Sequence, residues 1–170
     1  MPNGRIVTPS ESGHIDMPIS NEADFDLSQY IRKMHGFAGV EEVLSGRGLE
    51  NIYQWLMHRA GSQTTLDAAA IMAAVNDGSD PIATQAVQVF VRLLGAVAGN
   101  LSLIELPFGG VYLIGGVARA MAPYFAEFGF QQAFRDKGRF SEFMDSFSVT
   151  LIQDDYAALA GCAGYLTTTH

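Results

Sequence analysis

The stretch from Val87 to Leu106 is the most apolar in the chain, and it limits the folds that the rest of the sequence can adopt. It is interrupted by Gln88, Arg92, Asn100 and Glu105. These interruptions favour a buried helix over a membrane span, which requires a predominantly apolar run. Just before it, Asp80 and Pro81 suit the N-cap and the first position of a helix. We predict a central helix that begins at Pro81 and ends near Leu103.

Other helices are expected around this one. Apolar side chains recur at intervals of three and four residues in 27–34 and again in 49–57, which marks one face of a helix in each case. The segment 45–48 separates them and contains two glycines that allow a bend. A further helix should run from about Thr65 to the turn at 76–78.

Strands are expected mainly in the second half of the chain. Two glycine pairs bracket 111–114, whose unbroken apolar character is typical of a strand covered on both faces. A helix over 117–125 and a second strand at 149–152 should follow, and then a small-residue helix from Tyr156 to Leu166. Weaker strand candidates are 5–8 and 15–17. This order indicates an α/β or α+β fold.

Composition excludes several classes of protein. The 170 residues suit one domain, and 48% of them are apolar, which is enough to form a core. A net charge of −8 argues against nucleic-acid or anionic-membrane partners, which bind basic patches. The lone Cys162 cannot form an internal disulfide, as is usual in a reducing compartment.

Two acidic motifs are candidates for binding a small polar ligand. In the first, Glu11 and His14 flank a glycine bend and could converge on vicinal hydroxyl groups, although an exposed polar turn has the same pattern. In the second, either Glu41 or Glu42 could point into a cleft while the other is solvated. The alternative for that pair is the charged first turn of a short helix.

A glycine pair, Gly115 and Gly116, follows the predicted strand 111–114 and opens a helix. Such a turn lets a ligand approach backbone amides, but it also occurs merely for tight packing. The pattern is not a G-x-G-x-x-G dinucleotide motif, and no Walker A sequence is present. The four histidines lack metal-ligand spacing, so we expect no metal site. The loop 136–140 could face a phosphate or could be a solvated turn.

Taken in order, these segments resemble the bacterial glucokinase family, over about 9–166. Five motifs carry the resemblance: Glu11-Ser12-Gly13-His14, the segment 43–53 (Val-Leu-Ser-Gly-Arg-Gly-Leu-Glu-Asn-Ile-Tyr), Ala98-Gly99-Asn100-Leu101, the segment 109–116 (Gly-Gly-Val-Tyr-Leu-Ile-Gly-Gly), and the segment 133–140 (Ala-Phe-Arg-Asp-Lys-Gly-Arg-Phe). The zinc-binding cysteine cluster of the repressor-related glucokinases is absent, which supports the group assigned here.

The resemblance implies a fold and a set of site residues. The fold is the C-terminal part of an actin-like (ribonuclease H-like) ATPase, with a mixed sheet and a block of helices. Sugar ligands would be Glu11, His14 and Glu41, the last because it occupies the first position of the family's Glu-x-Val-Leu-Ser-Gly motif. Gly115 and Gly116 would lie beside the adenosine. Ser12 departs from the family's Glu-Gly-Gly-His, which adds only a hydroxymethyl group.

The resemblance also implies an activity. The intact protein would be a cytoplasmic, homodimeric glucokinase that uses ATP and Mg²⁺ to phosphorylate the 6-hydroxyl of glucose. Residues 1–155 would be part of its large domain, and 156–170 would pack on an N-terminal small domain. The family's Asp-x-Gly-Gly-Thr loop is not found in this sequence, and no residue matches the family's catalytic base, so we expect the chain alone to be inactive. The alternative is a non-catalytic sugar-binding or regulatory module.

Overall fold

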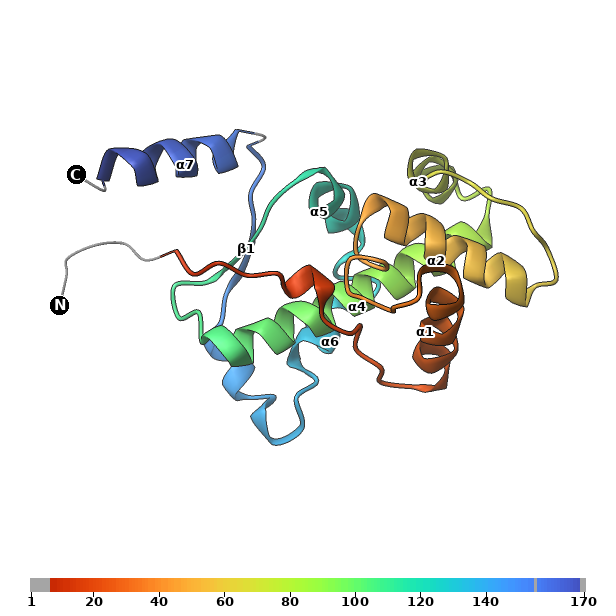
Figure 1. Cartoon of the computed structure of the whole chain (residues 1–170), viewed down its shortest axis with the longest axis horizontal. Helices are drawn as coiled ribbons and strands as arrows, with labels where there is room; N and C mark the ends of the chain where they lie inside the picture. The colour runs from red at the N-terminus through yellow and green to blue at the C-terminus, as the bar shows by residue number, and fades with distance from the viewer. Residues whose placement is uncertain (1–6, 155, 169–170) are drawn as a thin grey trace.

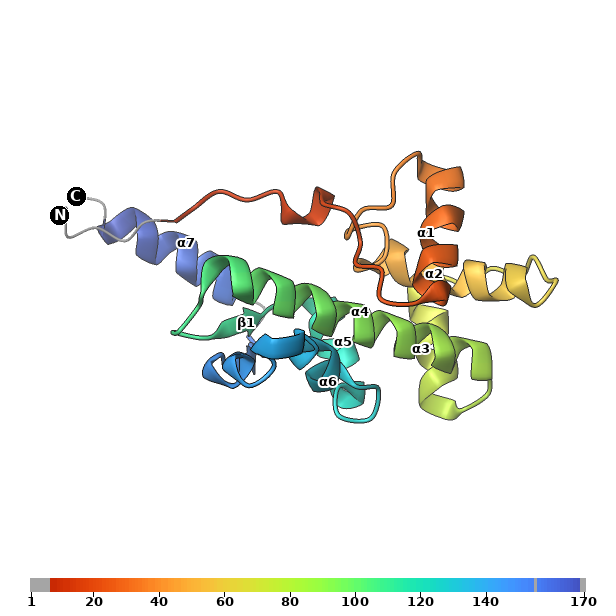
Figure 2. The ribbon, with the colours of Figure 1, turned by 90° about the horizontal axis from the view of Figure 1, so that it is seen from below.

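A computed structural model describes residues 7–154 and 156–168. Its main helices are α1 (Glu22–His35), α2 (Gly46–Arg59), α3 (Ala68–Asp77), α4 (Pro81–Glu105), α6 (Phe130–Arg135) and α7 (Ala157–Thr168). Helix α4 runs along the molecule, with α1, α2 and α3 gathered at one end (Figures 1 and 2). The shorter helical segments are η1 (Ser12–His14), α5 (Gly116–Met121), η2 (Ala122–Tyr124), η3 (Gly138–Phe140) and η4 (Phe143–Ser146).

The predicted central helix is confirmed as α4. Its N-cap is Asp80, whose Oδ1 accepts a hydrogen bond of 2.7 Å from the Ile82 amide. Asp80 also anchors α2, because its Oδ2 accepts a bond of 2.8 Å from the Tyr53 hydroxyl. Burial, and then that hydrogen bond, raise the pKa of Tyr53 to about 12. By length and composition α4 could cross a membrane, but 56% of its most apolar window is buried inside the protein, as in a core helix.

Two glycines of α4 allow α6 to pack unusually close. A Cβ atom on Gly95 would lie 2.3 Å from the carbonyl oxygen of Phe130, and one on Gly99 would lie 2.4 Å from that of Phe134. Both distances are far inside van der Waals contact, so a side chain at either position would push the helices apart. Gly95 and Gly99, one turn apart on α4, therefore form the surface against which α6 packs.

We expect Gly95→Ala to lower the free energy of unfolding by about 1–3 kcal/mol, the usual cost of overpacking a rigid core. The atom it would meet is backbone, which cannot rotate away. Urea denaturation measures the loss. Gly109→Ala is the matched control, because a Cβ there meets nothing within 4 Å. Equal stability of the two variants would contradict the close packing of α4 and α6.

The sheet in the described residues consists of two parallel strands, β1 (Val111–Leu113) and β2 (Val149–Leu151), with Val111 paired to Val149. Both strands were predicted, but the expectation that β1 is covered on both faces is wrong. Tyr112, at the middle of β1, is 59% exposed, whereas Val111 and Leu113 on the other face are partly buried, so only one face of the strand is covered.

The weaker strand candidates near the N-terminus do not form strands in the described residues. Asp16 makes a single antiparallel bridge to Gly39, and Ser12–His14 is a short 3-10 helix instead. Residues 15 and 17 bond to the backbone of 38–40, but the pairing does not extend beyond this one bridge. Of the candidate at 5–8, residues 5 and 6 lie outside the described residues.

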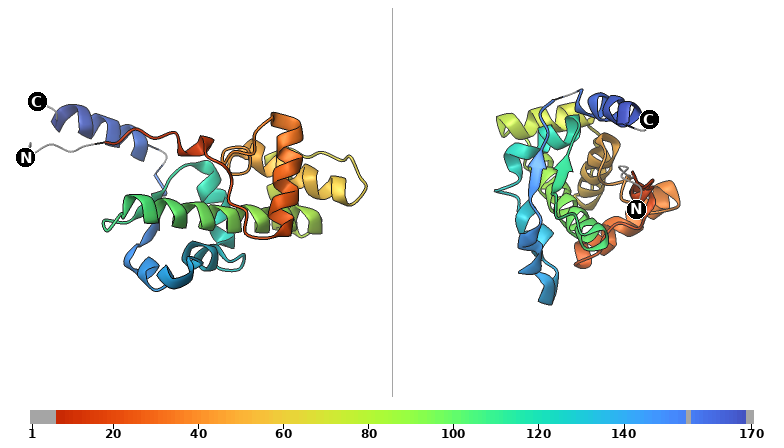
Figure 3. Two further views of the ribbon diagram at one scale, coloured as in Figure 1. Left: turned by 60° about the horizontal axis from the view of Figure 1, so that its bottom comes forward. Right: turned by 90° about the vertical axis from the view of Figure 1, so that its left-hand side faces the viewer.

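The last helix, α7, lies at the opposite end of the molecule from α3 (Figures 1 and 3). Its sequence lacks charged residues, which is typical of a covered helix, yet its large side chains are open to solvent in this chain. Leu159 is 66% exposed, Tyr165 38% and Leu166 68%. Residues 155, 169 and 170 of the predicted domain ranges lie outside the described residues, as do 1–6.

Candidate functional site

Two segments from different parts of the chain are joined by backbone hydrogen bonds at the candidate sugar site. The Met17 amide donates to the Ala38 carbonyl (2.9 Å), and the Val40 amide donates to the Ile15 carbonyl (2.9 Å). The Glu41 amide completes the set with a bond of 2.8 Å to the Gly13 carbonyl. The turn that carries Glu41 is thereby fixed beside the bend that carries His14.

This pairing brings the side chains of His14 and Glu41 together. The Nε2 atom of His14 lies 3.8 Å from Oε2 of Glu41, and both side chains remain accessible, at 69% and 50% exposure. Glu11 is exposed on the same segment, and its carbonyl accepts a bond of 2.9 Å from the His14 amide. Two of the three predicted sugar ligands are in contact, and the third lies one short helical turn away. An imidazole and carboxylates in this arrangement offer both donors and acceptors to a ligand with hydroxyl groups.

The structure separates the roles of the two neighbouring glutamates, which sequence reasoning from the residues had left open. The Glu42 side chain is only 20% exposed, with its Oε1 atom 3.2 Å from Arg47 and its Oε2 atom 3.6 Å from Nδ1 of His35. Glu42 therefore links the end of α1 to the start of α2. Glu41 is the glutamate available to a ligand.

The glycine pair lies where the chain passes from β1 into α5. Gly115 has φ 105°, which favours glycine, and a Cβ on either glycine would meet nothing within 4 Å. Gly116 lines an apolar groove of about 310 Å³ between α2, α3 and α5. Its other walls include Gly46, Leu49, Ala68 and Met72, none of which the sequence indicated as neighbours of the glycine pair. Only helix packing brings these residues together.

Other residues that the sequence offered as candidates either make contacts within the protein or lie exposed. Lys137 of the 136–140 loop turns toward the protein: its Nζ lies 3.4 Å from the Ala96 carbonyl and 3.5 Å from the Ala133 carbonyl, and burial lowers its pKa. Cys162 is exposed on α7. In 7–154 and 156–168, no three His, Cys, Asp or Glu side chains are grouped so that they could hold a metal ion.

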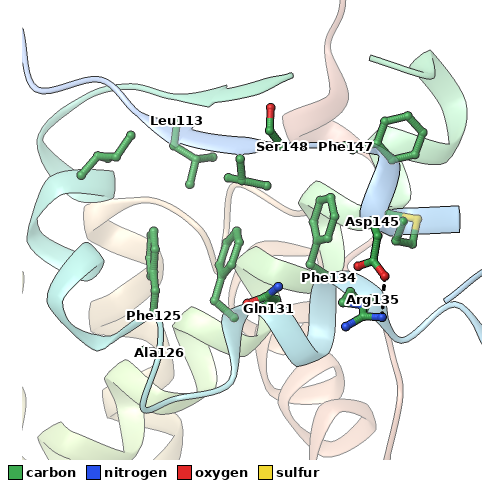
Figure 4. Close-up of a pocket in the computed structure, with 13 residues that line it drawn as sticks. Leu113, Phe125, Ala126, Gln131, Phe134, Arg135, Asp145, Phe147 and Ser148 are labelled. Carbon is green, nitrogen blue, oxygen red and sulfur yellow. Dashed lines mark hydrogen bonds and ion pairs between the residues drawn. The ribbon is translucent and has the colours of Figure 1, made fainter. Parts of the chain in front are cut away.

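A larger pocket of about 460 Å³ lies between the sheet and α6 (Figure 4). Phe125 and Phe134 line it opposite Leu113 of β1, and the ion pair between Arg135 and Asp145 (2.8 Å) lies at one side. None of the predicted site residues lines this pocket, so it is separate from both candidate sites.

Comparisons with known proteins agree on one family. The family model described as glucokinase matches residues 1–169. A glucokinase of Rhizobium etli is 35% identical over 161 residues, and one of Mesorhizobium japonicum is 37% identical over 161 residues. Each alignment covers 94% of this chain and 47% of the relative, so the chain spans about half the length of these curated relatives.

Solved structures show the same likeness. The crystal structure of a glucokinase from an Antarctic psychrotroph superposes with a TM-score of 0.87 at 31% identity, covering 94% of this chain and 50% of that protein. A Balamuthia mandrillaris glucokinase, solved in complex with glucose, gives a TM-score of 0.74 at 24% identity over 88% of this chain and 44% of that one. The α/β class and the resemblance to the C-terminal portion of a glucokinase are confirmed. The chain belongs to the glucokinase family.

Proposed function

We propose that the protein carrying this chain is an ATP-dependent glucokinase, which transfers the γ-phosphoryl group of ATP to the 6-hydroxyl of glucose. The observation that carries the proposal is the contact between His14 and Glu41, with Glu11 close by, in a chain that belongs to the glucokinase family. The carboxylates would accept hydrogen bonds from sugar hydroxyls, and the imidazole would donate or accept one. A related fold has been solved in complex with glucose, which supports this choice of sugar.

ATP would bind in the groove between α2, α3 and α5. The apolar groove beside Gly116 suits a flat base, and the open space at Gly115 and Gly116 allows a nucleotide to approach the backbone. Mg²⁺ would be brought by the ATP phosphates, because Mg²⁺ usually binds through substrate phosphates and few carboxylates. We further propose that the enzyme works in the cytoplasm as a homodimer.

The exposed helix α7 supports the proposed division into domains. With Leu159 and Leu166 about two-thirds exposed, α7 has an apolar surface that a partner surface would bury. We propose that residues 156–170 pack on an N-terminal small domain, and that 1–155 form part of the large domain.

The 170-residue chain by itself should not phosphorylate glucose. Phosphoryl transfer requires held phosphates and, as a rule, a base that orients the hydroxyl, and this sequence lacks the family motifs for both. A coupled assay of glucose-dependent ADP formation tests this, with the Glu11→Ala chain as the background. Turnover above that background would refute the expectation.

The same assay on the full-length protein tests the proposed function itself. Glucose-dependent ADP formation that requires ATP is the expected result. Glucose binding without any turnover would instead favour a sugar-binding or regulatory module.

A further inference from the structure

The turn that carries Glu41 is held from behind by helix α2. Asn51 of α2 is only 3% exposed, and its Nδ2 donates a hydrogen bond of 2.9 Å to the carbonyl oxygen of Glu42. Gly48, one turn earlier, lies directly against the same segment, since a Cβ there would be 2.5 Å from the carbonyl carbon of Val43. The turn therefore rests on two residues of α2 whose type is dictated by contact with its backbone.

The hydrogen bond from the Asn51 side chain matters because it is made to a backbone carbonyl of the turn that carries Glu41. A buried carbonyl oxygen that loses its donor keeps the cost of desolvation without compensation. The carbonyl that Asn51 binds belongs to the residue immediately after Glu41. On the other side of Glu41, its own amide is bonded to the Gly13 carbonyl. The backbone around Glu41 is thus held from two directions, by α2 and by the segment of His14.

The side chain of Glu42 strengthens this arrangement. Its carboxylate contacts Arg47 and faces His35, so it points toward the helices, whereas the carboxylate of Glu41 faces His14. A shift of the turn would have to break the contacts of Glu42 before it could move Glu41. Of these contacts, the bond from Asn51 is the most enclosed, because the Arg47 side chain is 59% exposed.

We propose that Asn51 is a positioning residue of the sugar site: it holds the carbonyl of Glu42, and so keeps the carboxylate of Glu41 facing His14. This inference rests on the proposed function, since Glu41 is a sugar ligand only by that proposal. Asn51 itself does not face the ligand. Its effect on sugar binding passes entirely through the backbone of the turn.

The test uses Asn51→Leu in the full-length protein, which keeps the bulk of the side chain and removes the donor. We expect KM for glucose to rise about tenfold, the effect of one lost buried hydrogen bond, with KM for ATP and kcat within about twofold of the parent. General damage to the fold would alter all three. Tyr53→Phe is the matched control on the same helix, because it loses a buried bond to Asp80 without touching the turn. It should leave KM for glucose unchanged.

A second measurement does not depend on sugar or activity. Hydrogen exchange of the Glu41 amide without glucose should be faster in Asn51→Leu than in Tyr53→Phe, since the bond to Gly13 would be weakened. The shorter Asn51→Ser provides the same comparison if the leucine variant does not fold. Unchanged exchange at Glu41 would overturn the positioning role. Faster exchange with an unchanged KM for glucose would instead remove Glu41 from the sugar site, and so count against the proposed site.

Discussion

Replacing Arg92 with methionine should lower the free energy of unfolding by about 3–5 kcal/mol, because it leaves a buried carboxylate without its counter-charge. That carboxylate belongs to Asp24, which is 1% exposed. Both of its oxygens accept hydrogen bonds from the Arg92 guanidinium, one of them 3.1 Å long. The pair joins α1 to α4, so its loss should also loosen the segment that leads to the sugar site.

Two further variants make this expectation specific. Arg32→Met removes an exposed ion pair with Asp16, whose partners are 44% and 67% exposed, and should cost no more than about 1 kcal/mol. The double variant Asp24→Leu/Arg92→Met should recover much of the loss, because it also removes the buried carboxylate. Urea denaturation of the four proteins measures this. If Arg92→Met were no worse than Arg32→Met, the buried pair would not be a main contact between α1 and α4.

Replacing Glu41 with alanine should weaken glucose binding by about 1.5–3 kcal/mol, the range for hydrogen bonds that involve a charged group. The effect should be roughly ten- to a hundredfold in the dissociation constant for glucose. Calorimetric titration of the full-length protein with glucose measures it directly. ATP affinity should change little, because the groove beside Gly116 does not include Glu41.

The matched control is Glu42→Ala, the next residue along the turn. Its carboxylate contacts Arg47 and faces His35, so its loss should lower stability more than it lowers glucose affinity. His14→Ala should behave like the Glu41 variant, with a loss of about 1–3 kcal/mol in glucose binding. Equal glucose affinity in the Glu41 and Glu42 variants would refute the assignment of Glu41 to the site.

Local sequence signals were sufficient for most of the secondary structure. The Asp80-Pro81 start of α4 depends on one side chain and one ring, which act within a few residues, and the glycine at 78 ends α3 in the left-handed conformation that glycine favours. The sequence also predicted strand β1, but it did not predict which faces of that strand are buried. A continuous apolar run suits a strand buried on both faces, and whether each face is covered depends on elements far along the chain.

In the candidate site, too, some features were predicted from the sequence and others were fixed only by the tertiary structure. Motif by motif, the sequence predicted Glu11, His14, Glu41 and the glycine pair as site residues through a family resemblance, and of these predictions the family itself is now shown. Which of the two glutamates stays accessible beside His14 was decided only by tertiary structure. Asn51 and Gly48 of α2 hold the turn, Arg47 and His35 engage Glu42, and the Gly13 carbonyl binds the Glu41 amide. Such contacts join residues distant in sequence, and periodicity or propensity describes only near neighbours. The amino-acid sequence therefore determined the helices, the strands and the identity of the chemical groups, whereas packing determined the direction in which those groups point.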